Sequence, residues 1–190
     1  MDEATLIRQA RRGDRQAFGE LFRLHVGDAV RAAYAVTRDW EAAEDAVQEA
    51  FIRAFAALPS FDPERPFRPW LFRIVVREAR RAAGRLRRTV PVPEAGLPQP
   101  VRTAASAEAE VLRRDRARAL GEAIRMLGPR RAVAVVLKYL LGFKEEEIAG
   151  LLGVPRSTVK SRLHEARRDL GRLLGPDLGD ESEWIPGSAG

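Results

Sequence analysis

Apolar residues recur three and four positions apart along most of the chain, which is the period of an α-helix with one buried side. Asp14 and Asp39 each stand where a side chain can cap such a helix, and the second helix is expected over Trp40–Ala57. The segment RRAVAVVLKYLL could pass for a strand, but its length and surroundings favour a buried helix. No convincing alternation of period two is present, so the sequence predicts an all-α fold.

The helical pattern is interrupted by one proline-rich stretch that has no hydrophobic period. Such a stretch is typical of a linker partly stiffened toward polyproline II. We therefore expect two small helical domains, 1–88 and 108–174, joined by a flexible linker at 89–107 and followed by an acidic, disordered tail at 175–190. A relaxed linker of this length averages roughly 30 Å from end to end, which permits a compact chain with its domains packed together.

In the second block, the pattern predicts helices over Ala107–Met126, Pro129–Leu141 and Lys144–Leu152. The last of these lacks a Ser or Thr cap, so we expect its first turn to fray. Gly153 permits a sharp exit from it, and Pro155 suits the first turn of a longer helix that follows. This arrangement predicts a helix-turn-helix, although any antiparallel helical hairpin could give the same pattern.

The longer helix has one apolar side and one side of hydroxyl and cationic residues. In a helix-turn-helix, the second helix lies in the major groove of DNA, with its N-terminal residues near the base edges. Small hydroxyls allow close approach, and Lys and Arg can bond to guanine acceptors or to phosphates. The candidate DNA contacts on this side are Arg156, Ser157, Thr158, Lys160, Ser161, Arg162 and His164.

The helix Trp40–Ala57 carries an isoleucine, Ile52, in the middle of the side that should be most polar. Acidic and amide side chains surround it, as they would the centre of a protein interface with a polar rim. A stray exposed apolar residue is also normal on a protein surface. The candidate interface consists of Asp45, Gln48, Glu49 and Ile52.

A stripe of arginines follows one side of the helix expected from Arg68 to Arg88. Cations three and four residues apart repel each other mildly, so a repeated stripe costs stability unless something negative neutralises it. DNA phosphate is the neutraliser that the pattern favours. A solvated charged face is the other explanation, but such a face usually alternates in sign, and only Glu64 and Glu78 lie nearby. The candidate DNA contacts are Arg73, Arg77, Arg80 and Arg81.

Aromatic residues lie in and beside the proline-punctuated loop PSFDPERPFRP that precedes this helix. Phe61 or Phe67 in the loop, together with Trp70 just beyond it, could stack on an unpaired base. Packing in the core is the other explanation for Trp70. These three residues complete the candidate nucleic-acid site of the first block.

Composition narrows the chemistry further. The net charge of +6 and the pI of about 10.6 favour a polyanionic partner. The absence of cysteine excludes disulfides, zinc fingers and thiol catalysis. The two histidines, His25 and His164, stand too far apart to indicate a metal site, and the acidic runs are better explained as charged first turns of helices. We therefore expect neither a catalytic site nor a cofactor.

Three motifs, in this order, resemble those of bacterial RNA polymerase sigma factors of the extracytoplasmic-function type, group 4 of the sigma-70 family. The family's segment for binding core RNA polymerase is similar to AEDAVQEAFIRAF, and its segment for the minus-ten promoter element is similar to FRPWLFRIVVREARR. The helix-turn-helix that reads the minus-35 element is similar to EEEIAGLLGVPRSTVKSRLHEARRDL. The resemblance covers the chain from about Phe18 to Leu174.

The resemblance implies roles for the candidate residues. The Ile52 face would dock on the polymerase, the loop would capture a flipped base of the minus-ten element, and the arginine stripe would hold the separating strands. Relatives often have Asn where this chain has Arg77, so a phosphate contact is the more plausible role there. The family also implies an anti-sigma partner, which nothing in the sequence identifies.

We therefore predict a cytoplasmic sigma factor that binds core RNA polymerase and promoter DNA and directs transcription initiation with promoter melting. We expect it to have no catalytic activity of its own and no small-molecule substrate. The first alternative is a stand-alone helix-turn-helix regulator that does not act through the polymerase. A helical adaptor without DNA contact is the second, and an enzyme is disfavoured because the sequence contains no metal-ligand set.

Overall fold

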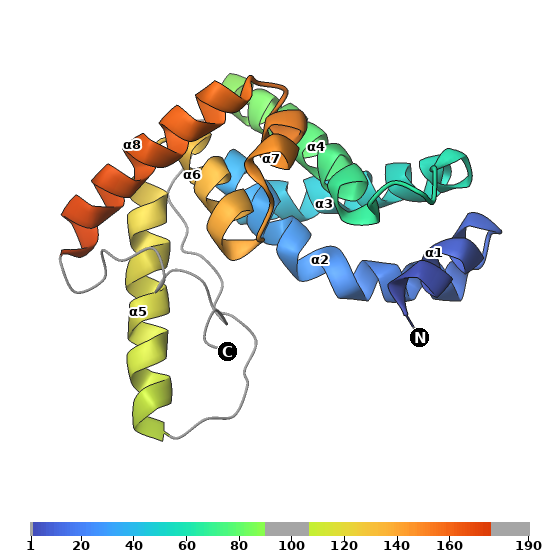
Figure 1. Ribbon diagram of the computed structural model, residues 1–190, viewed down its shortest axis with the longest axis horizontal. Coiled ribbons are helices and arrows are strands. Elements are labelled where there is room, and N and C mark those ends of the chain that lie inside the picture. Colours follow the sequence, from blue (N-terminus) through green and yellow to red (C-terminus); the bar gives the residue numbers. More distant parts are fainter. Residues whose placement is uncertain (1, 90–106, 176–190) are drawn as a thin grey trace.

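The computed structural model describes residues 2–89 and 107–175 of the 190-residue chain (Figure 1), with side chains at 2–86 and 117–175. Within these ranges every regular element is helical and no strand is present, which confirms the predicted all-α fold. The predicted linker at 89–107 and tail at 175–190 lie almost entirely outside the described residues. The elements are α1 (Glu3–Arg11), α2 (Arg15–Thr37), α3 (Trp40–Ala57), a 3-10 turn (Leu58–Ser60), α4 (Phe67–Thr89), α5 (Ala107–Met126), α6 (Pro129–Val135), a π turn (Val136–Leu140), α7 (Glu145–Leu152) and α8 (Arg156–Leu174).

Capping hydrogen bonds confirm two of the predicted helix starts. The Asp14 carboxylate accepts hydrogen bonds from the backbone N–H groups of Gln16 and Ala17 at 2.8 and 3.1 Å. Asp39 accepts one from Ala42 at 2.8 Å. Both satisfy N–H groups that have no partner within the helix. α2 and α3 therefore begin where the sequence predicts.

The first helix, α1, was not predicted from the hydrophobic pattern. Its start is capped by Asp2, whose carboxylate accepts a hydrogen bond from the backbone N–H of Thr5 at 3.0 Å. Leu6, Ile7 and Ala10 are buried, and they lie on one side of the helix. A capping Asp followed by apolar residues at helical spacing was the available signal.

The predicted fraying at the start of α7 is wrong. The Glu147 side chain accepts a hydrogen bond from the backbone N–H of Lys144 at 2.7 Å, so an acidic residue in the first turn supplies the missing partner. At the other end of α7, Gly153 has a φ of 60°, which only glycine adopts without cost. The sharp turn into α8 is therefore confirmed.

The helices form two groups that share one core. α1 to α4 pack against one another, and α5 to α8 form the second group. Contacts also run between the groups, from α2 to α6 and from α4 to α7. The buried apolar residues of both groups belong to one cluster, in which the rings of Phe72 and Phe143 lie 5.1 Å apart. The division into domains at 1–88 and 108–174 stays a prediction.

Replacing Phe72 by Leu is expected to lower the free energy of unfolding by about 1 kcal/mol, since Phe72 is fully buried between the two groups. In a chain of this size the melting temperature should fall by roughly 2–4 °C. Thermal unfolding followed by circular dichroism measures this shift. Phe22→Leu makes the same change at a side chain that is 37% exposed, so its loss should be smaller. Equal losses would contradict the packing role of Phe72.

Candidate nucleic-acid interface

α8 presents the side that the sequence predicts for DNA. Val159, Leu163, Ala166 and Leu170 are buried, as the apolar stripe requires. The hydroxyl and cationic residues lie on the opposite side, where DNA could reach them. Of the predicted contacts, the exposed ones are Arg156, Ser157, Lys160, Ser161 and His164, and the half-buried ones are Thr158 and Arg162.

At the start of α8, Arg156 is engaged by the preceding helix. Its guanidinium lies 3.3 Å from a carboxylate oxygen of Glu145 and 2.6 Å from one of Glu146. Exposed ion pairs of this kind contribute at most about 1 kcal/mol. A DNA phosphate could therefore replace these carboxylates as the partner of Arg156.

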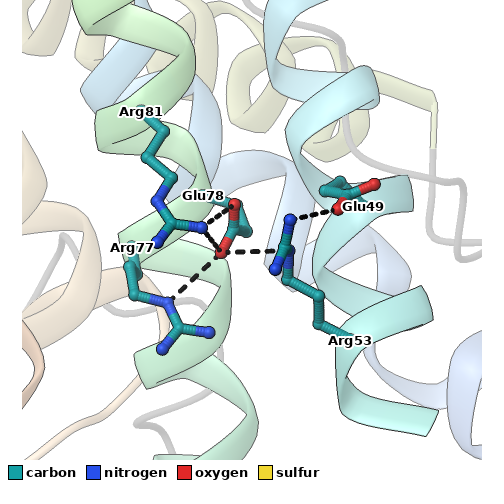
Figure 2. Close-up of polar contacts among 5 residues, drawn as sticks. All are labelled: Glu49, Arg53, Arg77, Glu78 and Arg81. Carbon is teal, nitrogen blue, oxygen red and sulfur yellow. Dashed lines mark hydrogen bonds and ion pairs between the residues drawn. The ribbon is translucent and has the colours of Figure 1, made fainter. Parts of the chain in front are cut away.

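Part of the arginine stripe on α4 is neutralised by a buried carboxylate (Figure 2). Glu78 is only 3% exposed, and it accepts hydrogen bonds from Arg77 at 3.2 Å and from Arg81 at 3.0 Å. Arg53 of α3 lies 3.4 Å from the same carboxylate and also pairs with Glu49 at 2.6 Å. DNA is thus not needed to offset the repulsion between the two arginines of α4, although both remain half exposed.

Ile52 is 58% exposed in the middle of α3. Asp45 and Gln48 beside it are exposed, and Glu49 is half-buried. All four residues line a groove between α3 and α4, whose opposite wall includes Arg81. The exposed isoleucine therefore has acidic residues on its own helix and a cation across the groove, as suits the edge of a protein interface.

The aromatic residues of the loop pack against one another. The ring of Trp70 lies 4.7 Å from that of Phe61 and 5.5 Å from that of Phe67. Phe61 and Phe67 are 4% and 5% exposed, so neither offers a ring face to a base in this structure. Packing in the core explains both of them, whereas the half-buried Trp70 keeps part of its surface accessible.

Three arginines of the first group donate hydrogen bonds to carbonyl groups at helix ends of the second group. Arg38 bonds to three carbonyls at the end of α5. Arg68 bonds to the carbonyl of Leu141 at 2.6 Å, and Arg80 to that of Leu152 at 2.8 Å. The last carbonyls of a helix lack internal partners and carry partial negative charge, so a guanidinium stabilises them.

Two of these arginines are held by further features. Arg38 has a φ of 62° and is the one non-glycine residue of the described ranges in the left-handed region. Arg68 pairs with Asp28 at 3.1 Å and lies 4.6 Å from the centre of the Phe143 ring, within the range of a cation–π interaction. The contact between the groups is thus polar at its edge and aromatic at its centre.

Arg80 brings the two candidate DNA surfaces together. Partial burial of its guanidinium, and then the nearby Arg162 of α8, lower the pKa of Arg80. The two cations were predicted to contact the minus-ten and minus-35 elements, which lie roughly 50–70 Å apart on DNA. This arrangement directs both surfaces at one region and cannot span both elements.

Neither a metal centre nor a membrane span is found in the described parts of the chain. No group of three or more His, Asp or Glu side chains there could hold a metal ion. No helix among residues 2–89 and 107–175 is long and apolar enough to cross a bilayer. The described surfaces are therefore best characterised by their charge and their apolar contacts.

Several residues that organise the site were missed in the sequence. A carboxylate at Glu78, four residues after the apolar Ile74, was a usable signal, because it places an acid on the inward side of an arginine-rich helix. Arg38 had no comparable signal. Its carbonyl partners lie 86 to 89 residues further along the chain, beyond any local pattern.

Comparison with known proteins matches both halves of the chain. Residues 21–89 match the family model for Sigma-70 region 2, and residues 117–170 match that for Sigma-70, region 4. The chain is 37% identical over 173 residues to the ECF RNA polymerase sigma factor SigM of Mycobacterium tuberculosis, covering 91% of this chain and 85% of that protein. It is 30% identical to the ECF RNA polymerase sigma factor SigW of Bacillus subtilis, with coverage of 88% and 94%.

Solved structures agree with these sequence matches. CnrH in complex with the cytosolic domain of CnrY is similar, with a TM-score of 0.62, 30% identity, and coverage of 90% of this chain and 96% of that one. The sigma factor RpoE of Bartonella quintana, in complex with the anti-sigma factor NepR, has a TM-score of 0.65, 25% identity, and coverage of 84% and 98%. The chain therefore belongs to the sigma-70 family of RNA polymerase sigma factors, in its extracytoplasmic-function (ECF) group.

Proposed function

We propose that this sigma factor, which directs transcription initiation by RNA polymerase, divides the task among three surfaces. The Ile52 face of α3 binds core RNA polymerase, α4 and the loop before it bind the minus-ten element, and the N-terminal half of α8 binds the minus-35 element. The observation that carries this assignment is the 58% exposure of Ile52 beside acidic residues, next to but distinct from the cations of α4. The proposed place of action is the cytoplasm, where the polymerase works.

On α4, the proposed contacts are to phosphates. Arg73, Arg77 and Arg81 are exposed, and none of them carries an apolar or hydroxyl neighbour suited to reading bases. Arg77 and Arg81 stay oriented by Glu78 while their guanidinium groups remain half exposed. Trp70 is the proposed stacking residue, because its ring is more accessible than those of Phe61 and Phe67.

Ile52→Glu is expected to weaken binding to core RNA polymerase by about tenfold or more, since it places a charge at the centre of the proposed interface. Competition against a labelled wild-type chain for purified core polymerase measures the change. Leu24→Glu is the matched control, because Leu24 is 59% exposed on α2 and lies outside the Ile52 face. Equal affinities of the two variants for the core enzyme would contradict the assignment.

The arrangement in Figure 1 is, in this proposal, a closed form of the free protein. Arg80 is bonded to the end of α7 and stands near Arg162, so neither basic surface is placed to bind its own promoter element. Binding to the polymerase would separate the two groups of helices, and tethering would then raise the effective concentration of each surface at the promoter. The closed form is tested by the second prediction of the Discussion.

An anti-sigma partner is a further part of the proposal. It is supported by the similarity to RpoE, which was solved in complex with the anti-sigma factor NepR. Such a partner should bind the full chain and suppress run-off transcription by reconstituted holoenzyme in proportion to its concentration. A binding protein that leaves transcription unchanged would not fill this role.

A further inference from the structure

We propose that α1 carries a second single-stranded DNA site, in which Arg8, Arg11 and Arg12 bind phosphates of the strand that leaves the minus-ten loop on its 3′ side. This inference rests on the proposed function of that loop. It extends the DNA surface to a helix outside the three sigma-factor motifs of the sequence. It also lies outside the matched region 2, which begins at residue 21.

The three arginines face the loop across a groove. Arg8, Arg11 and Arg12 line one side, and Pro59 and Pro63 line the other. α1 also contacts the 3-10 turn at the start of the loop, so the groove is a fixed feature of the packing. A strand whose base is held by the loop would therefore pass the arginines at close range.

These arginines also lack the partners that other basic residues of the chain have. Arg8 and Arg12 are exposed, and neither makes an ion pair within the described ranges. The Nε atom of Arg11 is buried and has no hydrogen-bond partner. Glu64 also lines the groove, but no ion pair joins it to the three arginines. On α4, by contrast, Arg77 and Arg81 are paired with Glu78.

A structural role at the end of α1 explains these arginines less completely. Cations in the last turn of a helix stabilise its dipole, and Arg8 also bonds to Thr5 at 2.8 Å. That role needs only exposed positions near the helix end. It does not account for three cations gathered at one groove opposite a nucleic-acid loop, with a buried Nε left unpaired.

The direction of the strand follows from the arrangement of the helices. α4 leads away from the loop toward α7 and α8, which belong to the group proposed to read the upstream minus-35 element. DNA upstream of the loop would therefore follow α4. α1 lies at the opposite end of the first group, beyond the loop (Figure 1), so it would meet the downstream part of the strand.

The test compares holoenzymes made from the wild-type chain and from Arg8→Gln/Arg12→Gln. Fluorescence anisotropy measures binding to three single strands: the minus-ten element of a mapped promoter, the same element extended by about six nucleotides on its 3′ side, and the element extended equally on its 5′ side. For a loss of two phosphate contacts, the affinity for the 3′-extended strand should fall roughly tenfold, and the slope against salt should decrease by about 1.4. The other two strands should bind within about twofold of wild type.

The matched control is Arg23→Gln/Arg118→Gln, which removes two exposed arginines that are paired with acidic residues elsewhere. It should bind all three strands as the wild type does. Unchanged binding of the Arg8→Gln/Arg12→Gln holoenzyme to the 3′-extended strand overturns the inference, as does an equal loss on all three strands. Failure of wild-type holoenzyme to bind any of the strands overturns the minus-ten assignment itself, and the α1 site with it.

Discussion

Replacing Lys160 by Glu and Arg162 by Gln in α8 is expected to lower transcription from minus-35-dependent promoters at least about 30-fold. A contact from either cation to a base edge is worth about 1–3 kcal/mol, and 1.4 kcal/mol corresponds to tenfold. Gln is chosen at Arg162 because a carboxylate there would stand near Arg80 and could stabilise the closed form. Run-off transcription with reconstituted holoenzyme measures the effect.

The control for this experiment keeps the same change in charge and moves it away from the proposed groove contacts. Arg118→Glu/Arg172→Gln alters two exposed arginines, one on α5 and one near the end of α8. Its transcription should remain within about twofold of wild type, because surface substitutions away from a site have small effects. Comparable losses in both double variants would mean that net charge, and not the N-terminal half of α8, determines promoter use.

Replacing Arg38 by Gly and Arg68 by Gln is expected to open the free protein. The change removes the bonds to the end of α5 and to the Leu141 carbonyl, and it also removes the cation beside the Phe143 ring. Glycine is chosen at Arg38 because it adopts the φ of 62° without strain, so the backbone turn should survive. Arg80 is left in place, because it is itself a proposed DNA contact.

Small-angle X-ray scattering of the free chain measures the opening. A compact chain of 190 residues has a radius of gyration of about 16 Å, and separation of the two groups should add roughly 4 Å or more. The opened variant should also bind a minus-ten single strand about tenfold more tightly than the free wild type, since charged hydrogen bonds of about 1.5–3 kcal/mol each no longer favour the closed form. Unchanged scattering together with unchanged DNA affinity would contradict the closed form.

Much of the secondary structure could be predicted because it depends on neighbours in sequence. The Asp14 and Asp39 caps bond to N–H groups two or three residues away, and Gly153 sets the turn by its own backbone freedom. The inward stripe of α8 follows from the helical period alone. The start of α7 was misjudged because Glu147, three residues after the cap position, was not weighed as a capping partner.

The candidate site was predicted in part. The exposure of Ile52 and of the outward residues of α8 follows from the same periodicity, since a residue opposite the apolar stripe faces solvent. The aromatic loop could not be assigned in this way, because a loop has no period that separates inside from outside. Only the packing of Phe61 and Phe67 against Trp70 places their rings in the core.

By itself, the sequence determined the helical content, the helix-turn-helix, the charge of its outward side and the family of the protein. These properties arise from local spacing and from motifs that are continuous in the chain. Only the tertiary structure decided which arginines are free, because a partner such as Glu78 turned inward or a carbonyl more than 70 residues away depends on how helices meet. The closed arrangement and the unpaired arginines of α1 both follow from that long-range packing.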